Sequence, residues 1–153
     1  MFYKKPHYNK IQTMTIIEKY IAHNHFGKIL GMDFKIIEPG LVHYFLTITQ
    51  DHLSTPRAAH GGVIAALMDG VLGVAALSTV VEQQKIVSTV EFKINYLTPA
   101  LLNDQLKGIG KVEHAGNRII VSSGDIICTN RQDMIIAKAI GTFNAYPYEK
   151  VAF

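Results

Sequence analysis

Hydrophobic residues recur with two different spacings along this chain, and each spacing predicts its own kind of element. A first helix is predicted from about Thr13 to Phe26, with Gly27 as its stop signal. Its apolar face consists of Ile16, Ile17, Tyr20 and Ile21. Residues 62–81 form an apolar run that predicts a second, longer helix, and Asp69 is the only charged residue in it. A helix that is apolar on nearly all sides is typically enclosed by a sheet or covered by a partner subunit.

Strand-like spacing flanks this long helix on both sides. Residues 34–49 predict a β-hairpin around a Glu38-Pro39-Gly40 turn. Residues 85–97 alternate as a half-buried strand does, with one face formed by Val90, Phe92, Ile94 and Tyr96 and the other by Thr89, Glu91, Lys93 and Asn95. Three more strands are predicted at residues 104–114, 118–129 and 134–146, separated by turn signals at residues 115–117 and 130–133. These three strands make an antiparallel meander.

The order of elements predicts one α+β domain, in which an antiparallel sheet of about five to six strands wraps around the long central helix. The length of 153 residues is typical of a single domain, and residues 1–29 form an N-terminal extension with a short helix. The alternative for residues 62–81 is a membrane span, since a run of about 18 apolar residues can cross a bilayer. An aspartate at the centre of a span is costly and no Lys or Arg cluster flanks the run, so we prefer the buried helix.

Composition and charge narrow the classes of function. The 15 basic and 12 acidic residues give a net charge of +3, with no basic block longer than Lys4-Lys5, so a nucleic-acid partner is not indicated. The single cysteine, Cys128, lies in an apolar stretch that favours a buried, inert thiol over a nucleophile. The N-terminus shows no secretory signal, and the expected location is the cytoplasm. The histidine spacing indicates no metal site, and no cofactor is expected.

Three stretches of the sequence carry a family resemblance: "LGMDFKIIEPG" at residues 30–40, "HGGVIAALMDG" at residues 60–70 and "TVEFKINYLTPA" at residues 89–100. From about Leu30 to Phe143 the chain resembles the hotdog-fold thioesterases of the phenylacetate-degradation type. The resemblance implies a hotdog fold and hydrolysis of an acyl-CoA thioester to a free acid and coenzyme A. It also implies a homodimer or homotetramer whose active sites lie between paired subunits.

The start of the long helix has the properties of an oxyanion-binding site. A helix N-terminus has unpaired backbone N–H groups and a partial positive charge. Because Gly61 and Gly62 lack a Cβ, a ligand carbonyl can approach these donors closely. A tight turn or close helix–sheet packing is the alternative role for the two glycines. The resemblance assigns polarisation of the thioester carbonyl to the Gly61 N–H, keeps Gly62 as a substrate-binding candidate, and implies that His60 holds the preceding loop by hydrogen bonds.

Asp69 is the candidate catalytic acid–base residue. A carboxylate in apolar surroundings loses solvation, which favours taking a proton from water or attacking an electrophile. Both roles stay open, and the alternative is a structural carboxylate bonded to a neighbouring strand or paired with a cation. Gly61 and Asp69 are eight residues apart, which is roughly 12 Å along one helix. One carbonyl cannot contact both, so we expect a site shared between two antiparallel copies of the helix across a twofold axis.

Other positions of the family pattern are changed or less specific in this chain. Thr89 matches a small hydroxyl residue that orients the nucleophile or its water, with an ordinary strand threonine as the alternative. Ser54 stands where the family often has an asparagine that binds the carbonyl or water, and Arg57 stands where a glycine is common. Basic side chains at the mouth of the site should meet the phosphates of coenzyme A, and the candidates are Arg57, Arg118 and Lys93.

Two alternative functions follow from the same fold. A hotdog dehydratase or hydratase would need an Asp-x-Asn-Pro-x-His signature, which "DHLSTPRAAH" at residues 51–60 does not supply. A non-catalytic acyl-CoA or acyl-carrier binding protein would keep the pocket and lose turnover through the changes at Ser54 and Arg57. The sequence does not specify the acyl group, although the candidates for the pocket wall are Met68, Leu72 and Phe92.

Overall fold

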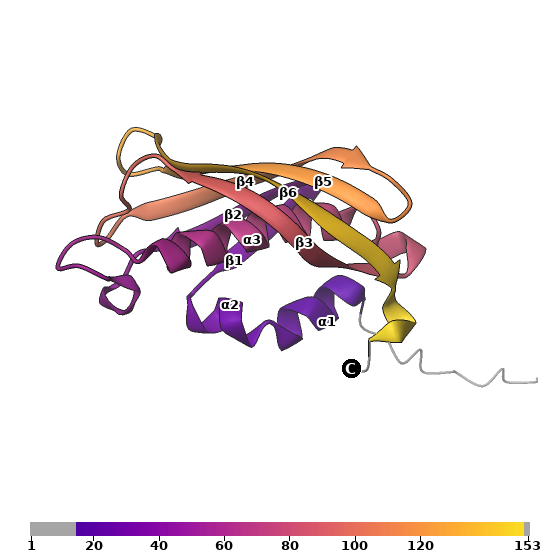
Figure 1. Ribbon diagram of the computed structural model, residues 1–153. Helices are drawn as coiled ribbons and strands as arrows, with labels where there is room; N and C mark the ends of the chain where they lie inside the picture. The colour runs from indigo at the N-terminus through magenta and orange to yellow at the C-terminus, as the bar shows by residue number, and fades with distance from the viewer. Residues whose placement is uncertain (1–14, 152–153) are drawn as a thin grey trace, which may run out of the picture.

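The computed structural model describes residues 15–151 and places six strands in one antiparallel sheet that curves over a central helix (Figure 1). The strands are β1 (Asp33–Glu38), β2 (Leu41–Thr47), β3 (Lys85–Tyr96), β4 (Gln105–Ala115), β5 (Ile119–Cys128) and β6 (Met134–Pro147). Their order across the sheet is β1-β2-β4-β5-β6-β3. The predicted α+β hotdog fold is therefore confirmed.

The central helix, α3 (Gly61–Ser78), forms the core of the domain together with the sheet. The side chains of α3 that are completely buried include Leu67, Met68, Val71 and Leu72. Helix and sheet approach closely at Gly110 of β4, where a Cβ would lie 2.3 Å from the backbone oxygen of Val71. By length and composition alone α3 could cross a membrane, but its burial against the sheet is that of the predicted core helix.

The predicted hairpin is confirmed as β1 and β2. Gly40 in its turn has a φ of 86°, a left-handed conformation that glycine adopts readily. The Gly40 N–H donates to Ser78 Oγ over 2.8 Å, which fixes the turn to the C-terminal end of α3. The predicted meander is confirmed as β4, β5 and β6, and β3 pairs with β6 at the far edge of the sheet.

The strand β3 departs from simple alternation at a β-bulge. Its pairing with β6 skips Val90, which leaves this residue as an extra one between Thr89 and Glu91. Thr89 and Phe92 consequently both lie on the side of the sheet that faces α3, and Val90 is 58% exposed. The prediction that Val90 lies on the buried face and Thr89 on the opposite face is therefore wrong, because a period of two does not allow for an inserted residue.

The helix predicted over residues 13–26 is two short helices, α1 (Ile16–His23) and α2 (His25–Ile29), and residue 13 itself lies outside the described range. The helix is interrupted at Asn24, whose side-chain oxygen accepts a hydrogen bond from the Gly27 N–H over 3.0 Å. Asparagine commonly caps a new helix in this way, in competition with a continuing one. The single predicted helix is therefore corrected to a helix pair.

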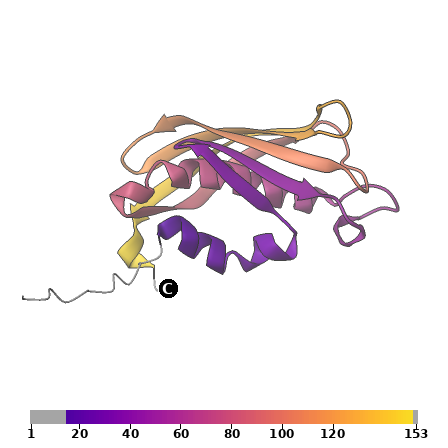
Figure 2. The ribbon, with the colours of Figure 1, turned by 180° about the vertical axis from the view of Figure 1, so that it is seen from behind.

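Gly27 lies inside α2, so the prediction of Gly27 as the stop signal is wrong. The glycine that follows α2 with a left-handed backbone is Gly31, which has a φ of 73° and lies directly after the C-cap residue Leu30. The two short helices lie on the side of α3 that faces away from the sheet (Figures 1 and 2). The described chain also contains three 3-10 turns, η1 (Gln50–His52), η2 (Val81–Gln83) and η3 (Tyr148–Lys150).

Candidate active site

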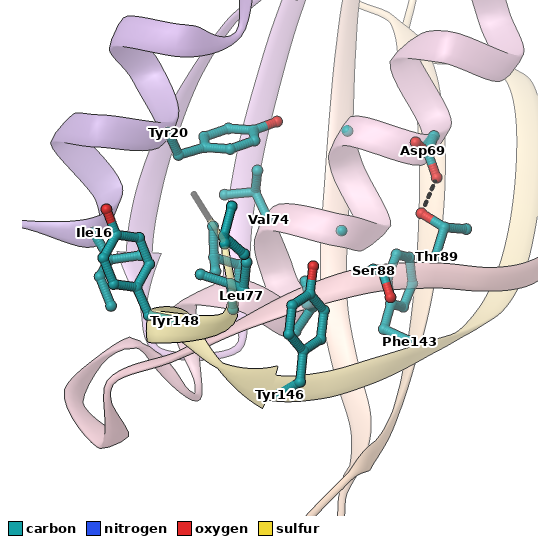
Figure 3. Close-up of a pocket in the computed structure, with 15 residues that line it drawn as sticks. Ile16, Tyr20, Asp69, Val74, Leu77, Ser88, Thr89, Phe143, Tyr146 and Tyr148 are labelled. Atoms are coloured by element: carbon teal, nitrogen blue, oxygen red, sulfur yellow. Dashed lines mark hydrogen bonds between the residues drawn. The ribbon is translucent and has the colours of Figure 1, made fainter. Parts of the chain in front are cut away.

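Asp69 of α3 and Thr89 of β3 face each other and form a hydrogen-bonded pair, called the acid pair below. The Thr89 hydroxyl donates to Asp69 Oδ1 over 2.8 Å (Figure 3). The other carboxylate oxygen, Oδ2, has no hydrogen-bond donor among residues 15–151. The carboxylate is half-buried and carries no counter-ion within the described chain. Thr89 thus fixes the rotation of the carboxylate and leaves one oxygen available to a water molecule or a substrate.

The acid pair borders a cavity of about 370 Å³ between α1, α3, β3 and β6. Its other walls are mainly apolar or aromatic and include Ile16, Tyr20, Val74, Leu77, Phe143 and Tyr146. A cavity of this size, largely apolar and with a few polar groups in one region, is typical of small-molecule sites. Met68 and Leu72, which were predicted as pocket-wall candidates, do not line this cavity and are completely buried in the core. The side of α3 that faces the cavity includes Asp69 and Gly70.

His60 and the two glycines form a second group, at the start of α3. His60 is the N-cap residue, and its Nδ1 accepts a hydrogen bond from the Gly62 N–H over 2.8 Å. A Cβ at Gly62 would lie 2.9 Å from that nitrogen, so glycine lets the imidazole fold back over the helix. The Gly61 N–H has no acceptor among the described residues. Of the two predicted donors, Gly61 is therefore the one left open to a ligand.

Tyr96, at the end of β3, belongs to the group at the helix start and was missed from the sequence. Its hydroxyl donates to the Gly61 backbone oxygen over 3.1 Å. Tyr96 and Gly61 border a second, smaller cavity of about 240 Å³. In the sequence Tyr96 is one more apolar residue in an alternating strand, and no local signal distinguishes it from a core residue.

The acid pair and the helix start are separate within one chain. Gly61 and Asp69 border different cavities, and the eight-residue offset along α3 corresponds to roughly 12 Å. A thioester carbonyl bound at the Gly61 N–H therefore cannot reach Asp69 of the same helix. Within one protomer the acid pair and the helix start are therefore at a distance from each other.

The remaining predicted residues lie in different places. Ser54 and Arg57 are exposed in the loop before α3, where the Ser54 N–H donates to the Ala58 oxygen over 3.0 Å. Arg118 follows the β4–β5 turn and donates to Asn144 Oδ1 over 3.4 Å. Lys93 is exposed in β3 on the face of the sheet away from α3. Of these four residues, Ser54 and Arg57 are therefore the ones in the loop that leads to the start of α3 in the same protomer.

A half-buried tyrosine, Tyr20, and a buried one, Tyr44, share the surroundings of Asp69. Burial raises the pKa of Tyr20 and of Tyr44, and the charge of the nearby Asp69 adds to both increases. Cys128 is buried as predicted, and its Sγ donates to Asn130 Oδ1 over 3.1 Å. Within residues 15–151 no group of three or more His, Cys, Asp or Glu side chains is arranged to hold a metal ion.

Comparison with known proteins places the chain in a family. Residues 58–135, more than half of the chain, match the model of the thioesterase superfamily. The chain belongs to this superfamily. No curated protein sequence matches it.

Solved structures with the same fold include three bacterial proteins. The PaaI protein of the phenylacetic acid degradation operon of E. coli has a TM-score of 0.77 and 22% identity, over 85% of this chain and 90% of that chain. The conserved protein PA5202 of Pseudomonas aeruginosa has a TM-score of 0.72 and 26% identity, over 79% and 93%. A hypothetical thioesterase of Streptococcus pneumoniae, solved with coenzyme A, has a TM-score of 0.70 and 25% identity, over 80% and 94%.

Proposed function

We propose that the protein hydrolyses acyl-CoA thioesters at a site shared between two copies of the chain. The observation that carries this proposal is the acid pair at the edge of an apolar cavity, together with the unpaired N–H of Gly61. Within one chain this N–H is too far from Asp69 for one thioester carbonyl to contact both. Family membership supports thioester hydrolysis as the class of reaction. The coenzyme A in the Streptococcus pneumoniae relative supports coenzyme A as the carrier of the acyl group.

Asp69 is the group that starts the reaction. Acting as a general base, its Oδ2 takes a proton from water, the oxygen of which forms a bond to the thioester carbon. Acting as a nucleophile, Oδ2 itself forms that bond and gives an anhydride, which water then hydrolyses. In both routes the carbon–sulfur bond breaks, the electron pair leaves with sulfur, and a proton completes the thiol of coenzyme A. Both routes are compatible with one oxygen held by Thr89 and the other available.

The carbonyl oxygen gains negative charge as the new bond forms, and a positioned N–H donor stabilises that charge. The Gly61 N–H is the donor we assign, supported by the partial positive charge of a helix start. His60 supports it indirectly, because its ring holds the Gly62 N–H and fixes the first turn. Tyr96 holds the same Gly61–Gly62 peptide group at its other end, through the Gly61 carbonyl oxygen.

In a homodimer the two α3 helices would lie side by side and antiparallel across a twofold axis. The start of one helix, with Gly61, would then lie beside the middle of the other, with Asp69. The strand β3 supports this arrangement, since it is an edge strand of 12 residues whose outer side is unpaired in the protomer. Two such dimers could pair into a tetramer. Ser54 and Arg57 would then lie near the carbonyl and the phosphates of coenzyme A, with Arg118 and Lys93 as further phosphate contacts.

The test is release of free thiol from a panel of short, medium, long and aromatic acyl-CoAs. We expect the Asp69→Asn variant to lose about 100-fold or more of kcat/KM, which corresponds to about 2.7 kcal/mol of transition-state stabilisation. Asp125→Asn is the matched control, because Asp125 pairs with Lys138 over 2.8 Å on β5 and β6, away from both cavities. Binding of acyl-CoA without thiol release from any member of the panel would show a binding protein instead of an enzyme.

A further inference from the structure

The N-terminal helix pair exposes large apolar side chains to solvent. Among residues 15–151 the two most exposed large hydrophobic side chains both belong to α2, where Ile29 is 81% exposed and Phe26 is 62% exposed. They are three residues apart and therefore lie on one face of this short helix. Ile21 of the adjoining α1 is also exposed. Apolar side chains grouped on a surface commonly mark a contact with another molecule or a membrane. Phe26 and Ile29 are called the N-terminal patch below.

The positive charge of the chain is concentrated in the same segment. Residues 1–29 contain five lysines and one acidic residue, whereas residues 30–153 contain ten basic and eleven acidic residues. Lys4, Lys5 and Lys10 precede the described residues, and Lys19 and Lys28 lie on α1 and α2. A basic segment that also carries exposed apolar side chains is attracted to anionic surfaces and has apolar groups to bury there. The segment thus has both properties of a peripheral membrane anchor.

The helix pair is the outer layer of the molecule on the side of α3 away from the sheet (Figures 1 and 2). Its inner side lines the cavity beside the acid pair, through Ile16 and Tyr20. The helix α2 leads into β1, which is the sheet edge opposite to β3. A dimer formed through β3 therefore leaves α2 uncovered. With the two α3 helices side by side, both helix pairs lie on one side of the joined sheet, so one flat surface can contact both.

We propose that the N-terminal patch is a peripheral membrane-binding surface for anionic lipid bilayers. Phe26 and Ile29 insert at the boundary between headgroups and acyl chains, and the lysines of residues 1–29 contact the anionic headgroups. The protein lies on the membrane and does not span it, because α3 is buried against the sheet. This proposal goes beyond thioester hydrolysis and does not depend on it, since vesicle binding is measured without a substrate.

An anionic lipid surface fits the N-terminal patch better than a second copy of the chain does. A twofold contact places a surface against its own copy, which would bring the lysines of residues 1–29 close to the same lysines of the partner. A stable protein interface also buries about 1,200–2,000 Å², more than a few side chains on two short helices supply. Nucleic-acid phosphates would match the lysines but would leave Ile29 in water.

The experiment is flotation of the full-length protein with lipid vesicles. One set of vesicles is phosphatidylcholine alone, and the other contains about one third phosphatidylglycerol. We expect the wild-type protein to float with the anionic vesicles only, and high salt to release it. Phe26→Ser combined with Ile29→Ser should weaken binding about tenfold or more. The matched control is Ile119→Ser with Ile140→Ser, which removes two exposed apolar side chains from β5 and β6 and should bind as the wild type does.

A second pair of variants tests the charge of the helix pair. Lys28→Glu and Lys111→Glu change the net charge of the protein equally, and both lysines are exposed, on α2 and on β4. We expect Lys28→Glu to weaken binding to the anionic vesicles about fivefold or more. Lys111→Glu should leave binding close to that of the wild type. Equal weakening by the two variants would show a general charge effect and would overturn the assignment to this surface.

Three further results would overturn the proposal. Absence of flotation with the anionic vesicles would point to an acidic protein as the partner of the patch instead. Unchanged flotation of the Phe26 and Ile29 double variant would show that the apolar side chains do not contact lipid. A smaller assembly of this double variant in size-exclusion chromatography would place the patch at a subunit interface. Thermal unfolding of each variant confirms that the fold is intact.

Discussion

At the scale of single residues, the site depends on one inserted amino acid. Thr89 reaches Asp69 because the bulge at Val90 changes which face of the sheet the residues before it point to. Asp69 and the glycines were predicted from local signals, an acid in an apolar helix and a glycine pair at its start, whereas Thr89 was predicted only from the family resemblance. Tyr20 and Tyr96 were not found as site residues, because an aromatic residue at an apolar position has the same pattern in a core and in a pocket.

The hydroxyl of Thr89 is expected to act through its hydrogen bond to Asp69. Thr89→Val keeps the shape and removes the donor, so kcat/KM should fall about tenfold to 100-fold, the range for losing a hydrogen bond to a charged group. Thr89→Ser keeps the hydroxyl and should stay close to wild type. Both variants are compared by the thiol-release assay on the best acyl-CoA. Equal activity of the Val and Ser variants would assign Thr89 a packing role only.

The N–H of Gly61 can be removed with little change to the helix. Gly61 is the first residue of α3, a position that proline favours, and His60 before it has φ −62° and ψ 136°, which a following proline requires. We expect Gly61→Pro to lower kcat about 100-fold, as loss of one oxyanion donor does. Gly61→Ala is the control, since it keeps the N–H and its Cβ would be 3.7 Å from the nearest atom. If the Ala and Pro variants lose activity equally, the side chain at this position matters and the N–H does not.

At the scale of elements, the hydrophobic pattern predicted the type and order of almost every helix and strand. The long helix, the hairpin and the meander have strong local signals, which are a continuous apolar run, a Pro-Gly turn and spaced turn residues. The bulge in β3 and the break at Asn24 were not predicted. The bulge depends on how β3 pairs with β6, and the break depends on a hydrogen bond from the Gly27 N–H to the Asn24 side chain. The spacing of hydrophobic residues does not indicate either feature.

The contact between α3 and β4 sets the spacing of helix and sheet. A methyl group at Gly110 would lie 2.3 Å from the Val71 oxygen, so Gly110→Ala requires the helix to move. Overpacking of this kind destabilises a fold by about 1–3 kcal/mol. Urea unfolding should show that loss for Gly110→Ala. Gly61→Ala adds the same methyl group where there is space and should show no such loss. An unchanged midpoint for Gly110→Ala would mean that the sheet adjusts to the helix at no cost.

At the scale of the whole molecule, a complete site is expected only in an assembly. The sequence suggested this because the distance between Gly61 and Asp69 along one helix is too long for one carbonyl. The structure supports the argument, since the two positions border separate cavities. The position of β3 at the edge of the sheet was not predictable from chain order, because β3 pairs with the last strand and not with the next one. We propose that a second copy of the chain pairs with that edge.

Hybrid dimers distinguish a shared site from a site within one chain. Asp69→Asn and Gly61→Pro chains carrying different affinity tags are co-expressed, and the hybrid is purified through both tags. If the sites are shared, one site of the hybrid combines the intact Asp69 of one chain with the intact Gly61 of the other. The hybrid should then have about half of the wild-type activity per dimer. If each chain forms its own site, both sites carry a substitution and the hybrid is as inactive as either parent.

The reciprocal hybrid reverses the expected result and serves as the control. It pairs a wild-type chain with a chain that carries Asp69→Asn and Gly61→Pro together. A shared arrangement leaves each site with one substituted residue, so thiol release should fall to the level of the single variants. A site within one chain would leave the wild-type chain fully competent, at about half of the wild-type activity per dimer. Because the two hybrids contain the same substitutions in different combinations, the difference between them depends only on which chains form a site.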